Sequence, residues 1–309
     1  MTGNRKVFGK NKRRIDFYFF SAFLLVMLVI AFPVSALAET HIYVDQTRGA
    51  NGADVQGTEA DPFKSITFAM LMMDNRGTPD PWVVHIKAGI YDADPEKPSG
   101  ERELFPIELR NGITLQGDDG AENCVISGAF NPLSGSALLR GQEKENITVR
   151  DLLLRDMDRN GGTGNGAACE LINCSGTVEG CILQSNKSSK TGGIWISLSD
   201  RQFFYVKGNT FIANEGTRSD GAGGVHVEGN YLGNISQNTF RGNRGIWAGA
   251  FTIYGNFAGN IDNNTFSKNT AGISGEGAFF ISEDFLGNIS ENVFSGRSEE
   301  RRVGKECIV

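Results

Sequence analysis

A repeat of about 28 residues is the feature that most constrains the fold of this chain. The segment Asn234–Phe240 returns as Asn260–Phe266 and again as Asn288–Phe294. Shorter copies precede them, so the final apolar position of the unit falls at residues 126, 154, 183, 211, 240, 266 and 294. The steps are 28, 29, 28, 29, 26 and 28 residues. A fixed period of this length predicts a solenoid whose stability comes from stacking of neighbouring repeats.

A second segment recurs between these units and indicates that the solenoid is built of strands. It is a small or glycine pair followed by an apolar run, as in Gly192-Gly193-Ile194 and Gly223-Gly224-Val225, with variants at Ala248-Gly249-Ala250 and Glu276-Gly277-Ala278. Short β-branched and aromatic runs alternate with Gly, Asn and Asp, and no long amphipathic helix is predicted after residue 80. The sequence therefore predicts an all-β parallel solenoid of about seven coils.

Asparagines occupy two registers of the repeat. The first register holds Asn209, Asn238, Asn264 and Asn292, and the second holds Asn186, Asn214, Asn243 and Asn269. Asn tolerates the left-handed backbone of a tight corner, and stacked Asn side chains form hydrogen-bonded ladders. We interpret both columns as structural rather than ligand-binding.

The repeats resemble those of two groups of β-helix proteins. Val206–Phe211 and its relatives, read as Val/Ile-x-x-Asn-x-Phe, resemble the Asn corner of pectate-lyase-like right-handed parallel β-helices. Phe-x-x-Asn units alternating with Gly-Gly-apolar units are similar to the repeats of polymorphic outer-membrane proteins, which are surface adhesins and autotransporter passengers. Both resemblances cover about residues 121–296 and imply a right-handed parallel β-helix, whereas they differ in the function that they imply.

Residues 39–110 are predicted to cap the β-helix of residues 111–296. Their motifs, from His41–Asp45 to Val83–Tyr91, are similar to the start of many exported β-helix proteins, including some polysaccharide lyases. We expect Asp61 to cap a helix with Phe63, Ile66, Met70 and Met73 on one side, which would close the open end of the solenoid. Calcium is the one cofactor considered, since the loop with Asp45, Asp54 and Asp61 offers carboxylates without the spacing of a known calcium loop.

Both ends of the chain differ in character from the repeats. Residues 1–38 are predicted to be a signal peptide, because basic residues precede the apolar run Phe17–Val34 and Ala36-Leu37-Ala38 offers a cleavage site. Export to the outside or the cell surface is therefore expected. Residues 297–309 lack the period and resemble a translated sequencing adapter, so we expect the native C-terminus, with any anchor, to be missing.

Charge narrows the range of partners. Without residues 1–38 the chain has 24 basic and 35 acidic residues, a formal charge of −11. An acidic protein repels phosphate backbones, so nucleic acid is not an expected partner. The expected partners are a polysaccharide or a cell surface, with membrane contact only through the leader or a missing anchor. The five cysteines show no zinc-type spacing and are interpreted as small buried hydrophobes.

A binding face is predicted on the first strand of each coil. Alignment on the glycine pair places Cys169, Trp195, His226, Phe251 and Phe279 in one column. Trp195, His226 and Phe251 would then form an aromatic platform for sugar rings. The alternative is that Phe251 and Phe279 point inward and only Trp195 and His226 are exposed.

Catalytic candidates lie near the same face, and three functions stay open. The lyase resemblance implies a substrate along this face, carboxylates that hold calcium and a basic residue that removes a proton. Arg218, Asp220 and Glu228 are the candidates, Glu228 and Asp220 being a glycosidase-like pair, with Asp200 and Arg201 nearby. Solvated loop charge is the alternative interpretation. The protein would be carbohydrate-binding or adhesive, a polysaccharide lyase or glycoside hydrolase acting on acidic polysaccharide, or a structural passenger without a site.

Overall fold

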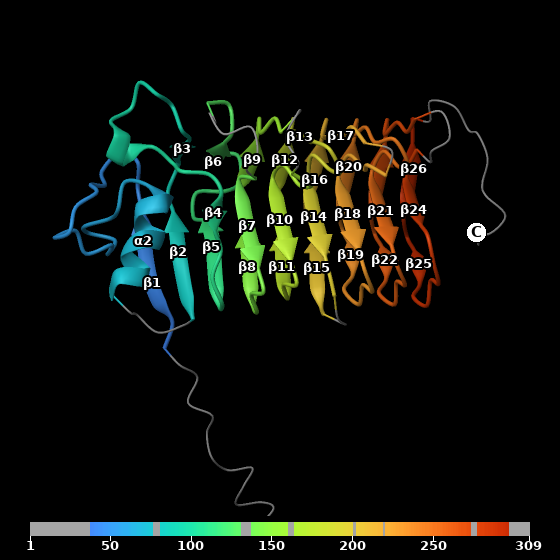
Figure 1. The fold of residues 1–309 in the computed structure, drawn as a ribbon, viewed down its shortest axis with the longest axis horizontal. Coiled ribbons are helices and arrows are strands. Elements are labelled where there is room, and N and C mark those ends of the chain that lie inside the picture. The colour runs from blue at the N-terminus through green and yellow to red at the C-terminus, as the bar shows by residue number, and fades with distance from the viewer. Residues whose placement is uncertain are drawn as a thin grey trace, which may run out of the picture. The chain divides into compact units, whose positions relative to one another are not determined.

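Three parallel sheets form the described part of the protein (Figure 1). The computed structural model describes residues 38–76, 81–130, 137–159, 164–199, 202–218, 220–272 and 277–296. The chain divides into two compact units, residues 1–38 and 39–309, and all the described elements belong to the second. The predicted leader and the predicted adapter segment lie outside the described residues, apart from Ala38.

From β4 onward each coil contributes one strand to each sheet, in the order C, A, B. Sheet C contains β4 (Ile107–Glu108), β7 (Leu139–Gln142), β10 (Cys169–Ile172), β14 (Ile194–Ser197), β18 (Val225–Glu228), β21 (Phe251–Tyr254) and β24 (Phe279–Ile281). Sheet A contains β1 (Thr40–Val44), β2 (Trp82–Ile86), β5 (Ile113–Gly117), β8 (Ile147–Arg150), β11 (Gly176–Glu179), β15 (Phe204–Lys207), β19 (Ile235–Ser236), β22 (Ile261–Asp262) and β25 (Ile289–Ser290). Sheet B contains β3 (Gly89–Tyr91), β6 (Cys124–Ser127), β9 (Leu153–Arg155), β12 (Ile182–Gln184), β16 (Thr210–Ile212), β20 (Thr239–Arg241), β23 (Thr265–Ser267) and β26 (Val293–Ser295).

The prediction of an all-β parallel solenoid with about seven coils is confirmed. Sheet C has seven strands, and a short extra pair, β13 (Lys187–Ser188) with β17 (Glu215–Gly216), bridges two coils. The repeat phenylalanines pair in register in sheet B as one file: Phe211, Phe240, Phe266 and Phe294. Their rings stack with centroids 4.7, 5.3 and 4.9 Å apart. Like residues therefore lie over like residues, and the file fills the interior of the solenoid.

The asparagine columns form continuous ladders inside the corners. Asn238 Nδ2 donates to the Val206 carbonyl at 2.8 Å and to Asn264 Oδ1 at 3.1 Å, and its own Oδ1 accepts from the Asn209 N–H at 2.9 Å. The second column repeats the pattern from Asn186 to Asn269. Each amide thus satisfies two buried backbone groups of the preceding coil and bonds the asparagine side chain of the following coil.

The left-handed residue at these corners is not the ladder asparagine itself. Positive φ occurs at the residue immediately before each one: Ser185, Gly208, Ala213, Gln237, Gly242, Asn263, Lys268 and Glu291. The expectation that the column asparagines adopt this backbone is wrong. They are held there by the hydrogen bonds of the side-chain amide, whereas the preceding position accepts several residue types.

An eleven-residue helix, α2 (Ile66–Arg76), contacts β1 and β4 at the N-terminal end of the solenoid (Figure 1). Its start differs from the prediction, because Asp61 accepts a hydrogen bond from the Gln56 N–H instead of capping the helix. The buried Glu103 carboxylate accepts the Ile66 and Thr67 N–H groups at 2.7 and 2.8 Å. Glu103 follows the short 3-10 helix η1 (Ser99–Glu101), so the free N–H groups at the start of α2 are bonded by a residue distant in sequence.

Four of the five cysteines lie in the core. Cys124, Cys169, Cys174 and Cys181 are buried free thiols, and burial raises the pKa of each. Cys307 lies outside the described residues. Among the residues that the structure describes, no helix has the length and apolar character needed to cross a bilayer.

Candidate functional site on the outer face of sheet C

The register of sheet C corrects the predicted binding column. Phe251 pairs with Val225 and Phe279, and this inward column also contains Ile194 and Cys169. The outward column, one residue further along each strand, consists of Glu108, Arg140, Glu170, Trp195, His226, Thr252 and Phe280. The sequence alignment matched Ala248-Gly249 with the pair Gly223-Gly224, whereas in the structure Ala248 pairs with Ala222. Phe251 was therefore aligned with His226 although it pairs with Val225.

Phe251 is therefore a core residue and not part of a platform. Its side chain is fully buried, and its ring stacks on Phe279 with centroids 4.7 Å apart. The alternative interpretation, with Phe251 and Phe279 pointing inward, describes what the structure contains. A one-residue slip in a strand moves a side chain to the opposite face, which accounts for the error.

Trp195 and His226 point away from the solenoid interior but are covered. Trp195 is 5% exposed and His226 is fully buried, contrary to the expectation that both are exposed. Gly166 lies against Trp195, where an added Cβ would come within 2.9 Å of the Trp195 Cβ. Thr252 Oγ1 lies 2.8 Å from His226 Nδ1 and holds the ring from the neighbouring coil.

Four side chains from adjacent coils form a cluster on this face, which we call the charged cluster: Lys190, Asp220, His226 and Glu228. Lys190 Nζ lies 2.8 Å from Asp220 Oδ2 and also pairs with Glu228. Glu228 Oε1 lies 3.3 Å from His226 Nε2. Two of the predicted catalytic candidates, Asp220 and Glu228, are thus brought together by a residue that the sequence interpretation omitted.

The other candidates near this face do not join the cluster. Arg218 is exposed, and within the described residues its side chain forms no ion pair with Asp220 or Glu228. Asp200 and Arg201 lie outside the described residues. Lys190 could have been found by aligning whole coils, because Thr191 pairs with Ala222 and this register sets Lys190 beside the Asp220 loop.

The charged cluster is electrostatically constrained. Hydrogen bonding to His226 and Lys190, opposed by burial, lowers the pKa of Glu228 to about 2. Burial acts against the charge of Lys190, but hydrogen bonds to Asp220 and Glu228 outweigh it and raise the pKa of the amine. Glu228 and Lys190 are therefore both ionised at neutral pH.

Three aromatic residues adjoin the charged cluster, and we call them the aromatic cluster: Trp247, Tyr254 and Phe280. The Tyr254 ring lies 5.5 Å from the ring of His226. The Trp247 ring lies 4.9 Å from that of Phe280. Trp247 is 37% exposed, and its backbone N–H donates to the Gly221 carbonyl beside Asp220 at 3.2 Å. One exposed and two half-buried rings therefore lie beside ionised groups on the outer face of sheet C.

The charged cluster also contains the one set of three potential metal ligands found among the described residues. Ligand atoms of Asp220, His226 and Glu228 lie within 4.8 Å of one another. The Lys190 ammonium, however, already binds both carboxylates. The predicted calcium loop does not form such a set, since Asp45 binds Arg48 and the Thr47 N–H, and Asp61 binds the Gln56 N–H.

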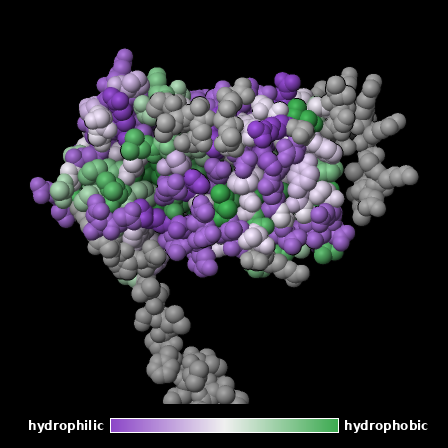
Figure 2. Space-filling view, viewed as in Figure 1, coloured by the Kyte–Doolittle hydropathy of each residue, from purple (hydrophilic) through white to green (hydrophobic). Residues whose placement is uncertain are grey.

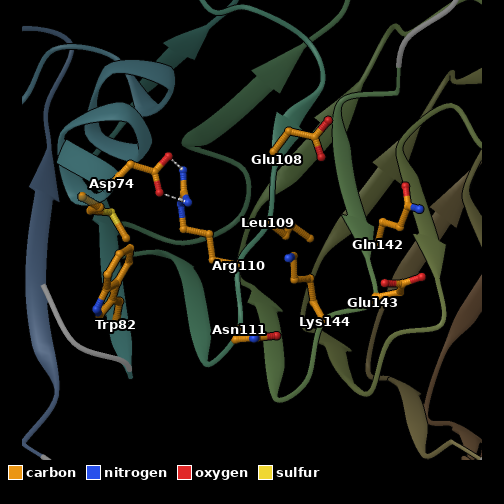
Figure 3. Close-up of a pocket in the computed structure, with 10 residues that line it drawn as sticks. Asp74, Trp82, Glu108, Leu109, Arg110, Asn111, Gln142, Glu143 and Lys144 are labelled. Atoms are coloured by element: carbon orange, nitrogen blue, oxygen red, sulfur yellow. Dashed lines mark hydrogen bonds and ion pairs between the residues drawn. The ribbon is translucent and has the colours of Figure 1, made fainter. Parts of the chain in front are cut away.

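A hollow of about 830 Å³, separate from the charged cluster, lies between α2 and the turns that follow β4 and β7 (Figure 3). Arg110 reaches across to Asp74 in α2 and donates to the Met70 carbonyl at 3.2 Å. Glu108 borders the hollow and begins the outward column of sheet C, and burial raises the pKa of its carboxyl group. Figure 2 shows hydrophilic residues over much of the face in view, with smaller hydrophobic patches among them.

These features define a parallel β-helix protein with a candidate ligand-binding face on sheet C. The chain belongs to the family described as Protein of unknown function (DUF1565), whose model matches residues 49–300. No curated protein matches the chain. One similar solved structure is the A-module of mannuronan C-5 epimerase AlgE4 from Azotobacter vinelandii, with a TM-score of 0.30 and 14% identity. The match covers 85% of this chain and 100% of that chain.

Proposed function

We propose that the protein is an exported carbohydrate-binding β-helix protein whose ligand lies on the outer face of sheet C. The observation that carries the proposal is the aromatic cluster, in which Trp247 is exposed and Tyr254 and Phe280 are half-buried, beside ionised Lys190 and Glu228. Aromatic rings provide flat apolar surface for sugar rings, and neighbouring charged groups bind hydroxyls. Export is supported by the apolar run and cleavage site predicted in residues 1–38.

The arrangement suits an extended polymer better than a small molecule. Seven strands spaced about 4.8 Å apart give sheet C a length of about 29 Å from β4 to β24. The outward column places a polar or aromatic side chain on each of these strands. Trp195, His226 and Thr252 in the middle of this column are buried, so a chain of several sugar units would contact the aromatic cluster at one end and the accessible side chains of Glu108, Arg140 and Glu170 at the other.

A binding assay on a panel of neutral, acidic and amino polysaccharides tests the proposal. Trp247→Ala and Tyr254→Ala should each weaken binding about tenfold, because an aromatic anchor typically contributes 1–2 kcal/mol. Tyr205→Ala is the matched control, since Tyr205 is a 38% exposed aromatic residue on sheet A. Lack of binding to every polysaccharide, or an equal loss with Tyr205→Ala, would contradict the proposal.

Hydrolysis of the bound polysaccharide is the second candidate function. Oxygen atoms of the Asp220 and Glu228 carboxylates lie within 4.8 Å of one another and both pair with Lys190, so two carboxyl groups are close together, as retaining glycosidases require. A pKa of about 2 suits Glu228 as a nucleophile and not as the acid. Release of reducing ends that is lost in Glu228→Gln would establish this function, and binding without release would leave the first proposal standing.

Calcium is tested in the same assay. Because Lys190 Nζ binds both carboxylates of the charged cluster, we expect a calcium chelator such as EGTA to leave polysaccharide binding unchanged. Loss of binding in EGTA, restored by added calcium, would instead assign the ion to this face.

A further inference from the structure

Two of the three histidines in the chain lie together on a different sheet. His41 and His85 belong to β1 and β2 of sheet A, where β1 is the edge strand and Tyr43 pairs directly with His85. His41 Nδ1 and His85 Nε2 are 2.9 Å apart, so the two rings share a hydrogen bond when no metal is bound. His41 is exposed, and the side chain of His85 is 15% exposed, so solvent reaches the pair.

The neighbours of His85 hold its ring in one orientation. Asp118 Oδ1 lies 2.9 Å from His85 Nδ1, which fixes the Nδ1 proton toward the carboxylate and leaves the Nε2 lone pair facing His41. Lys87 Nζ, 3.0 Å from Asp118 Oδ2, and Gln116 Nε2, 3.0 Å from Oδ1, anchor that carboxylate. The Tyr43 ring stacks on His85 with centroids 4.5 Å apart. A carboxylate that orients an imidazole in this way is the usual support of a histidine metal ligand.

We propose that His41 Nδ1 and His85 Nε2 bind a copper(II) ion at the N-terminal edge of sheet A. With metal–nitrogen bonds of about 2.0 Å, a nitrogen separation of 2.9 Å subtends about 93° at the metal. This matches two adjacent positions of a square-planar ion, whereas tetrahedral zinc needs nitrogens about 3.3 Å apart. Imidazole is a preferred ligand of copper(II), which leads the divalent affinity series, and the remaining positions are open to solvent. The site is independent of the proposed carbohydrate face.

Titration of the full chain with copper sulfate tests the site, with binding monitored by calorimetry and by electron paramagnetic resonance. The full chain is used because a chain beginning at Glu39 would present a free amine two residues before His41, a ligand set that needs no His85. We expect one copper per chain and a signal from two coordinating nitrogens. His41→Gln and His85→Gln should each weaken binding at least about tenfold, and Asp118→Asn about tenfold through the orientation of His85.

Thr148→Ala, on the outer face of the same sheet two coils away from β2, is the matched control and should bind copper as the wild type does. Unchanged thermal unfolding of the apo-variants would show that the loss is not a loss of fold. Wild-type affinity in both histidine variants, or a signal from two coordinating nitrogens that survives in His85→Gln, would overturn the proposal.

Discussion

At the scale of the residue, each corner separates a backbone requirement from a side-chain requirement. The left-handed position accepts Ser, Ala, Gln, Lys, Glu, Asn or Gly, whereas the next position is always asparagine in the two ladders. An L-residue tolerates positive φ at a moderate cost, but only a side chain with both a donor and an acceptor can connect three coils. The sequence therefore predicted the asparagine columns and their hydrogen-bonded ladders. It did not predict that the left-handed residue is the one before each asparagine.

Removal of one ladder amide should destabilise the protein strongly. Asn238→Ala leaves the Val206 carbonyl and the Asn209 N–H without their side-chain partners in a buried corner. We expect a loss of about 3 kcal/mol in the free energy of unfolding, measured by urea denaturation. Asn230→Ala, at an exposed position, should cost less than about 0.5 kcal/mol. Equal effects in the two variants would contradict a structural role for the ladder.

Glu228 should make the stability of the protein depend on pH in acid. Its folded pKa of about 2 lies below the ordinary value of 4.5, so the ionised carboxylate stabilises the fold above pH 4.5. That contribution is lost as the pH falls from about 4.5 to about 2. The stability difference between wild type and Glu228→Gln should shrink over this range in denaturation series. A difference that stays constant, or one matched by the exposed control Glu283→Gln, would refute the assignment.

At the scale of the element, the repeat predicted the strands better than their exact pairing. The phenylalanine file was predictable because the spacing of Asn and Phe is nearly constant in the later coils. Sheet C was harder, since a glycine pair is a poor register mark when alanine replaces one member, as at Ala248 and Ala250. Lys190 could be placed only by aligning whole coils, and the cover over Trp195 depends on a loop that varies between coils, which no repeat pattern predicts.

The file of stacked phenylalanines should behave as a continuous packing element. Phe240 is fully buried between Phe211 and Phe266, so Phe240→Ala creates a cavity in the middle of the file. We expect a loss of about 3–5 kcal/mol in unfolding free energy, measured by urea denaturation. Phe203→Ala, at a side chain that is 54% exposed, is the control and should change stability by less than about 0.5 kcal/mol. Similar losses at both positions would contradict the packing role.

At the scale of the whole molecule, three sheets serve different purposes in this account. Sheet B carries the phenylalanine core, sheet C presents the charged and aromatic clusters, and the edge of sheet A holds the histidine pair. A parallel solenoid permits this division because every coil adds one strand to each face. Substitutions on one outer face should therefore leave ligand binding on another face unaffected.

The predicted export of the chain has a simple test. Cleavage after Ala38 is predicted from the small residues at Ala36 and Ala38. Mass spectrometry of the protein from producing cells should find a chain beginning at Glu39 in the extracellular or envelope fraction. Replacement of both alanines by bulky residues should retain the leader. A cytosolic chain beginning at Met1 would contradict export.

Acrylamide quenching of tryptophan fluorescence shows directly whether saccharide binds over the aromatic cluster on sheet C. Trp82 and Trp195 are each 5% exposed and Trp247 is 37% exposed, so quenching reports mainly on Trp247. Addition of the polysaccharide selected from the panel should protect the fluorescence from quenching, and Trp247→Phe should remove the effect. Saturating binding that leaves the quenching of Trp247 unchanged would place the ligand elsewhere and contradict the account.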